Sequence, residues 1–196
     1  MQNTIDKKVV TGQLSAGVVE NPKILTCPRQ LKDFLKSSDF VWTKNSIQID
    51  MADILGLLLS GDTSYEIYGM YAEFGSGANP TVTSDARSYF HSTIPVTRDI
   101  IRVPLLITPS TSSSSSGVYT SNQLDFIALV PASGTGLVNG TSLTTGSTVR
   151  GGGLISVPGG AYTNDKVATW GYLSSSIDVP ASPSQVMLRW QLTFQI

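Results

Sequence analysis

The most regular pattern of hydrophobic and polar positions lies at residues 185–196, "QVMLRWQLTFQI". Every second position is apolar, and the positions between are polar except Met187. A period of two predicts a β-strand with one face in the core. A slip of one residue would turn that face outward, so we expect a fixed register with Trp190 in the middle of the buried face. The apolar positions are Val186, Leu188, Trp190, Leu192, Phe194 and Ile196.

Two short amphipathic helices are predicted in the first third of the chain. The first lies within "CPRQLKDFLKSS" (27–38), where Leu31, Phe34 and Leu35 share one face and Pro28 suits the first turn. The second lies within "DMADILGLLLSG" (50–61), with Asp50 expected to cap it and Gly61 to end it. Its apolar stripe consists of Met51, Ile54, Leu55, Leu58 and Leu59. Each helix is expected to cover the end or edge of a sheet.

From Tyr65 onward the pattern is that of a β-protein. "YEIYGMYAEF" (65–74) is apolar on both faces, which predicts a strand buried on both sides. "DIIRVPLLI" (99–107) is a further strand, in which Pro104 indicates an edge or a bulge. Turn-rich segments separate these strands from "NQLDFIALV" (122–130), "RGGGLISV" (150–157) and "VATWGYLS" (167–174). Strands without alternating helices predict a mainly β fold, a jelly roll or β-sandwich, rather than a doubly wound one.

The first 25 residues have no clear period and are expected to form an extended arm or an irregular edge strand. We therefore expect residues 1–45 to be an N-terminal arm with a short helix, and residues 46–196 to be one β-sandwich domain. The low-complexity run from Ser112 to Ser116 is interpreted as a loop within this domain.

Composition narrows the classes of partner. Charged residues make up 14% of the 196, with 13 basic against 14 acidic, so no positive stripe for nucleic acid is expected. The single cysteine, Cys27, forms no intramolecular disulfide. We find neither a signal-peptide pattern nor an apolar run of the length that a membrane span needs, and we expect no membrane partner.

Candidate chemistry is sparse. His91, with Asp85, Arg87 and Asp99 near it in sequence, allows a Ser-His-Asp hydrolase as one hypothesis, but a G-x-S-x-G nucleophile motif is absent and an ordinary loop histidine is favoured. Asn164 and Asp165 allow a calcium site or an ordinary turn. These alternatives leave a non-enzymatic protein, with no catalytic, cofactor-binding or metal-binding residues, as the expectation.

Two further patterns have a structural and a functional interpretation. The glycines of "RGGGLISVPGG" (150–160) are not followed by a helix that could bind phosphate, so a bulge or a flexible hairpin is favoured. Aromatic residues recur on the predicted strands, where core packing is favoured over an exposed platform for carbohydrate. They are Tyr65, Tyr68, Tyr71, Phe74, Trp170, Tyr172 and Trp190.

The order of these segments resembles that of small β-rich virion structural proteins of tailed bacteriophages. The resemblance covers roughly residues 50–196 and rests on "LLLSG", "YGMYAEF", "RDIIRVPLL", "LDFIALVP" and "VMLRWQLTFQI". It implies a capsid decoration, cement or minor capsid protein, located in the virion, that binds neighbouring virion proteins and forms a homo-oligomer, possibly a trimer. A tail component or a carbohydrate-binding jelly-roll module is the alternative. Binding is expected at the N-terminal arm and the Ser/Gly-rich loops.

Overall fold

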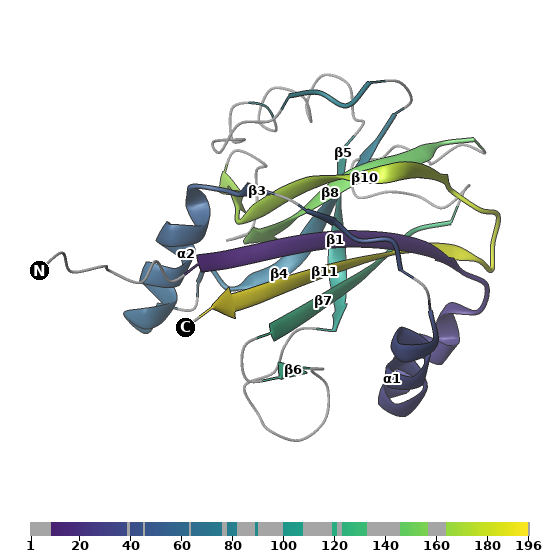
Figure 1. Ribbon diagram of the computed structural model, residues 1–196, viewed down its shortest axis with the longest axis horizontal. Helices are drawn as coiled ribbons and strands as arrows, with labels where there is room; N and C mark the ends of the chain where they lie inside the picture. Colours follow the sequence, from purple (N-terminus) through teal and green to yellow (C-terminus); the bar gives the residue numbers. More distant parts are fainter. Residues whose placement is uncertain are drawn as a thin grey trace, which may run out of the picture.

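The computed structural model of the chain describes residues 9–38, 40–44, 46–62, 64–75, 78–81, 89, 100–107, 119–120, 123–132, 146–156 and 164–195. These residues form a mainly β fold with a nearly closed antiparallel sheet and two α-helices, which confirms the expected fold class at this level (Figure 1). None of the described helices has the length and apolar character needed to cross a membrane.

Within the described residues, the sheet has eleven strands, nine of which follow one another in the order β2-β1-β11-β7-β5-β4-β8-β10-β3. Two short strands, β6 and β9, lie beside β7 and β8. The bounds are β1 Val9–Val19, β2 Thr43–Lys44, β3 Ser46–Ile47, β4 Ile67–Phe74, β5 Ile100–Ile107, β6 Tyr119–Thr120, β7 Gln123–Val130, β8 Thr148–Ser156, β9 Lys166–Val167, β10 Thr169–Asp178 and β11 Gln185–Gln195.

Strand β5 joins the two halves of the sheet. Its first part, up to Pro104, pairs with β4, and its last residues, from Leu105, pair with β7 (Figure 1). The pairing with β7 is irregular between Leu105 and Ile107, directly after the proline. The bulge that Pro104 indicated is therefore present, whereas the edge position is not, because β5 has a neighbour on each side.

The segment at residues 43–47 nearly closes the sheet. β2 pairs with β1 at Leu14, and β3, two residues further on, pairs with β10 at Trp170. One short stretch of chain thus lies between the two ends of the strand order. Next to it, the amide of Gln48 donates to the carbonyl of Ala168 at 2.9 Å and extends this contact.

The main core lies between the two halves of the sheet. The predicted buried face of β11 is confirmed, because Trp190 is fully buried at its centre and the face continues through Val186, Leu188 and Leu192. Its last position, Ile196, lies outside the described residues. The opposite half contributes Met70, Ala72 and Leu154, among others.

Both predicted helices are present, at opposite ends of the sheet in Figure 1. α1 (Pro28–Ser37) buries Leu31 and Leu35 against a cluster that includes Met187 on the second face of β11. A 3₁₀ helix, η1 (Pro22–Thr26), precedes α1 and adds Leu25 to this cluster.

The second helix, α2 (Asp50–Leu59), ends as predicted at Gly61, which has a φ of 88°. The amide of Gly61 donates to the carbonyl oxygen of Leu58, and the amide of Asp62 donates to that of Leu57. This is the hydrogen-bond pattern of a helix that ends on a left-handed residue. The expected cap by Asp50 is wrong. Its buried carboxylate instead accepts a hydrogen bond from the amide of Val167 at 2.9 Å and ties the helix to β9.

Of the two expectations for the N-terminal segment, an extended arm or an irregular edge strand, residues 9–19 form the strand, next to the end of the strand order. β1 pairs with β11 along its whole length, from Val9 opposite Gln195 to Val19 opposite Gln185, and Leu14 lies in the core. Its regular pairing was not predicted because glycines and small polar residues interrupt its alternation. Since β1 and β2 are strands of the common sheet, the sheet crosses the division that we placed at residue 45. Residues 1–8 lie outside the described part of the chain.

The glycine run belongs to the middle of a strand. Gly151, Gly152 and Gly153 are buried in β8 and pair in register with residues 71–73 of β4. A hairpin is therefore the wrong interpretation for these three glycines, although pairing irregularities do flank them in both neighbouring strands. Gly159 and Gly160 lie outside the described residues.

Candidate functional site

The outer face of the half-sheet β4-β8-β10 carries a second hydrophobic layer. Tyr71 of β4, Ile155 of β8 and Trp170 of β10 are buried there, together with Ile100 and Val167. Alternation along each strand sends neighbouring residues to the main core instead. The predicted burial of "YEIYGMYAEF" on both sides is thus confirmed for Met70, Tyr71 and Ala72.

Asp165 lies at one end of this layer, where an arginine and a tyrosine hydroxyl bind its carboxylate. The guanidinium of Arg102 on β5 donates to both carboxylate oxygens, through Nε at 2.9 Å and through Nη2. The hydroxyl of Tyr71 donates to the same carboxylate. A bidentate arginine and a third donor suit a carboxylate that is almost completely removed from water.

A second network of the same kind surrounds Glu73, which lies two residues after Tyr71 on β4. Arg150 of β8 donates to its Oε1 through Nε at 3.0 Å and through Nη2, and Tyr89 donates its hydroxyl at 2.6 Å. The Glu73 side chain is fully buried, so these donors take the place of water around its carboxylate. Each network therefore joins a buried carboxylate to one arginine and one tyrosine.

The pKa values of three tyrosines are raised further above neutral pH. Burial, then the charge of Asp165, raises the pKa of Tyr71 well above its usual range. Burial and the hydrogen bond to Glu73 do the same for the pKa of Tyr89. Burial and the charge of Glu73 raise the pKa of Tyr172 to about 12. Burial lowers the pKa of Arg150, but its hydrogen bond to Glu73 and the nearby negative charges together outweigh burial and raise the pKa overall.

A third arginine–carboxylate pair lies on the other half of the sheet. Arg189 of β11 donates to Asp125 of β7 at 3.0 Å, and Gln191 donates to the same oxygen at 3.2 Å. The guanidinium also lies over the rings of Trp42, at 5.0 Å, and Phe40, at 5.4 Å. This pair holds the segment between α1 and β2 on the sheet.

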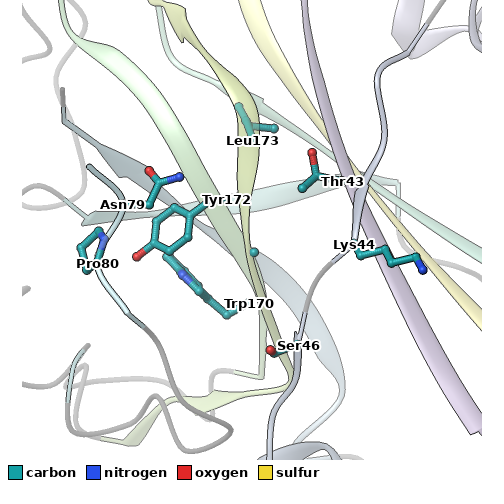
Figure 2. A pocket seen from close by; sticks show the side chains of 9 residues that line it. Thr43, Lys44, Ser46, Asn79, Pro80, Trp170, Tyr172 and Leu173 are labelled. Atoms are coloured by element: carbon teal, nitrogen blue, oxygen red, sulfur yellow. The ribbon is translucent and has the colours of Figure 1, made fainter. Parts of the chain in front are cut away.

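A groove runs along β10, and we call it the β10 groove. Its first part has a volume of about 450 Å³ and lies between the 43–46 segment and residues 79–80, with the ring of Tyr172 facing Asn79 and Pro80 (Figure 2). Its second part, of about 240 Å³, shares Asn79 and Leu173 with the first. Arg150, Gly75 and Ser174–Ser176 also line this second part.

A bulge in β10 produces the second part of the groove. Tyr172 pairs with Gly151 and Ile177 with Val149, so four residues of β10 lie opposite one residue of β8. Ser174, Ser175 and Ser176 fall in this bulge and are exposed. A bulge of this kind redirects side chains away from the regular ladder.

The candidates from the sequence divide into those outside the described residues and those within them. Asp85, Arg87, His91 and Asp99 lie outside the described residues, and so does the serine run 112–116. Asp165 is bound by Arg102 and Tyr71, and no group of three His, Cys, Asp or Glu side chains that could hold a metal occurs among the described residues.

The predicted aromatic positions are mainly core. Trp170 and Trp190 are 2% and 0% exposed, so neither ring can serve as a carbohydrate platform. Tyr172 is different, because it is only partly buried and lines the groove. The side chain of Tyr68 lies outside the described residues.

Sequence reasoning missed the arginine partners of the buried carboxylates. Arg102 interrupts the apolar run of "DIIRVPLLI", and that interruption is the signal that could have found it. Arg150 and Arg189 give no such signal, because Arg150 precedes the glycine run and Arg189 occupies a polar position of an alternating strand. A buried arginine needs an anion, so the position of Arg102 implies a carboxylate on a neighbouring segment. The sequence alone does not say which carboxylate it is.

One surface feature completes the candidates. The outward face of α2 is largely apolar, with Ile49 55% and Leu59 88% exposed. Between them lie exposed Ala52 and Gly56, and around Gly56 an added methyl group would meet nothing within 4 Å. We call these four residues the α2 face. Asp53, which pairs with Lys166 at 3.1 Å, borders it.

No protein-family model matches this chain, and the comparisons found no similar curated protein and no similar solved structure.

Proposed function

We propose that the chain is a non-enzymatic structural subunit of a tailed-bacteriophage particle, a capsid decoration, cement or minor capsid protein. It binds neighbouring subunits through protein surfaces and forms a homo-oligomer, with a trimer as one possibility. The sequence resemblance described above is the origin of the virion assignment. A tail component is the alternative within the same class.

The observation that carries the proposal is the α2 face. A side chain such as Leu59 that is 88% exposed gains most of its possible hydrophobic stabilisation only when another molecule covers it. Gly56 in the middle of an exposed helix costs about 1 kcal/mol relative to alanine. Since none of the described residues occupies the space beside Gly56, packing among them does not account for the glycine. The close approach of a neighbouring molecule accounts for the glycine.

We assign this face to a second copy of the chain. Its apolar centre, bordered by the charged pair Asp53–Lys166, has the anatomy of a protein interface with a polar rim. The low overall charge, 13 basic against 14 acidic residues, favours contact between identical subunits because they repel one another little. A closed symmetric assembly is the usual result of such contacts.

The two tyrosine networks support a structural role. A side chain that transfers protons at neutral pH needs a pKa near 7. Tyr71, Tyr89 and Tyr172 all have their pKa values moved in the opposite direction, and Asp165 and Glu73 are held by arginines. The hydrogen bonds of these groups hold Asp165 and Tyr89 on the outer face of the sheet.

The packing of two half-sheets around one core also supports the finer proposal that the fold is a sandwich of the jelly-roll type. Trp190 from one half and Met70 from the other lie in the same cluster. Inner faces that share one core are the defining feature of sandwiches.

Particle association tests the proposal. Virions from a phage that carries the gene are purified, and mass spectrometry measures the protein in them. We expect the protein in the particle, and we expect Leu59→Glu to reduce its incorporation because a charge would have to be buried. Val41→Glu is the matched control, since Val41 is 67% exposed and lies outside the α2 face. Absence of the wild-type protein from the particles would contradict the proposal.

A further inference from the structure

The β10 groove combines one accessible aromatic ring with neutral polar groups and two basic side chains. At one end lie Tyr172, the amide of Asn79, the hydroxyl of Ser46 and the exposed side chain of Lys44, whereas the hydroxyl oxygen of Thr43 is buried. At the other lie Arg150 and the hydroxyls of Ser174–Ser176. The bulge between Tyr172 and Ile177 brings the serines close to the aromatic end, since these five steps of β10 correspond to only two residues of β8.

The aromatic ring is held so that its polar end is turned inward. The hydroxyl oxygen of Tyr172 is buried, although the side chain as a whole is only partly buried. Trp170 packs edge-on against the ring at 6.0 Å between centroids and fixes its orientation. The remaining ring surface lies beside Asn79 and Pro80 in the groove (Figure 2). Such a surface contacts the apolar C–H side of a ligand.

The second part of the groove offers hydrogen bonds with little net charge. Both guanidinium hydrogen bonds of Arg150 within the described residues go to Glu73, which neutralises its charge and leaves Nη1 for a ligand. Gly75 lies against this guanidinium, and a methyl group there would approach Nη1 to 3.1 Å. The exposed serines both donate and accept. In this second part a neutral ligand rich in hydroxyl groups fits better than an anion, and the other charged side chain of the groove, Lys44, lies in the first part.

The backbone of β10 does not suit a peptide. Addition of a peptide strand needs a regular ladder of amides and carbonyls along an edge. The bulge between Tyr172 and Ile177 interrupts that ladder at the groove. The binding groups are therefore side chains rather than backbone.

We propose that the β10 groove binds a neutral oligosaccharide, with Tyr172 stacking on a sugar ring and Asn79, Arg150 and the serines of the bulge contacting its hydroxyls. This activity goes beyond the structural role and gives the particle a contact with a surface glycan. The aromatic contact is assigned to one half-buried tyrosine, since the tryptophans of the sheet are buried.

An array of neutral and acidic oligosaccharides, followed by calorimetric titration of the strongest neutral binder, tests this proposal. Asn79→Ala should weaken binding about fivefold to tenfold, as loss of one good hydrogen bond does. Gln30→Ala, an exposed amide on α1, is the matched control and should leave the affinity unchanged. Tyr172→Phe should retain binding, because its hydroxyl points inward, whereas Tyr172→Ala should lose it.

The thermal midpoint of each variant shows whether it folds, and Asn79 is exposed, so its variant keeps the test valid if Tyr172→Ala unfolds. No binding on the array, binding of acidic oligosaccharides alone, or equal affinity for wild type and Asn79→Ala would each overturn the proposal. None of these results bears on whether the protein is found in the particle.

Discussion

The ring of Trp170 lies directly over Gly153 of the neighbouring strand. An ideal Cβ at Gly153 would be 2.6 Å from Cε3 of the indole and 2.2 Å from the carbonyl oxygen of Thr169. Neither contact is possible, so the glycine is what allows the tryptophan to pack on β8. The glycine run therefore allows aromatic side chains of β10 to pack closely against β8.

The first prediction concerns this contact. Gly153→Ala should destabilise the protein by at least about 3 kcal/mol, the upper part of the usual range for overpacking, because one clash is with backbone. Urea unfolding measures the change. Gly56→Ala is the matched control, as open space surrounds it on a helix, and it should stabilise the isolated subunit by up to about 1 kcal/mol. Equal effects of the two substitutions would refute this explanation.

The second prediction concerns the centre of the main core. Trp190 is fully buried on the inner face of β11, so Trp190→Ala should cost about 3 to 5 kcal/mol through lost burial and the cavity left behind. Equilibrium unfolding followed by circular dichroism provides the value. A loss below about 1 kcal/mol would mean that this face is not core.

The third prediction concerns the pair Arg189–Asp125. Asp125→Leu alone should cost about 3 kcal/mol, because it leaves a nearly buried guanidinium without its anion. Adding Arg189→Met to the same chain should recover much of this loss, since the double variant has no charge to bury. A double-mutant cycle measures the coupling. Additive losses would show that the two residues act independently.

The fourth prediction concerns alkaline pH. Folding raises the pKa of Tyr71, Tyr89 and Tyr172, so above the unfolded value of about 10 the unfolded chain loses protons that the folded chain keeps. The stabilisation is complete below pH 10 and is lost as the pH rises through the folded values, the lowest of which is about 12 for Tyr172. Stability should therefore fall from about pH 10 upward.

Absorbance at 295 nm, with circular dichroism in parallel, measures this. We expect at least three of the seven tyrosines to ionise only well above pH 10. Tyr172→Phe should reduce that number by one. Ionisation of all tyrosines near pH 10 in a chain with native circular dichroism would contradict the burial of these hydroxyls.

Periodicity was sufficient for much of the fold. It located α1, α2 and the face of β11, because apolar side chains at regular spacing can only be buried on one side. It failed for β1, where Gly12, Ser15 and Gly17 interrupt the alternation although Leu14 is in the core. There, pairing with β11 rather than local pattern decides the structure.

The candidate site was less predictable because it depends on contacts between distant segments. Asp165 and Arg102 are 63 positions apart, and Glu73 and Arg150 are 77 apart. The β10 groove depends on a bulge of serines that resembles an ordinary polar stretch in sequence. The α2 face was also misassigned, since Leu59 was placed in the buried stripe and is instead exposed.

A density map of the intact particle tests the central claim most directly, because it locates the subunit and its neighbours together. We predict that the chain appears as a homo-oligomer on the particle, with Leu59 and Ile49 of each α2 face buried against another copy. A particle in which the chain is absent, or in which the α2 face points into solvent, would contradict this account.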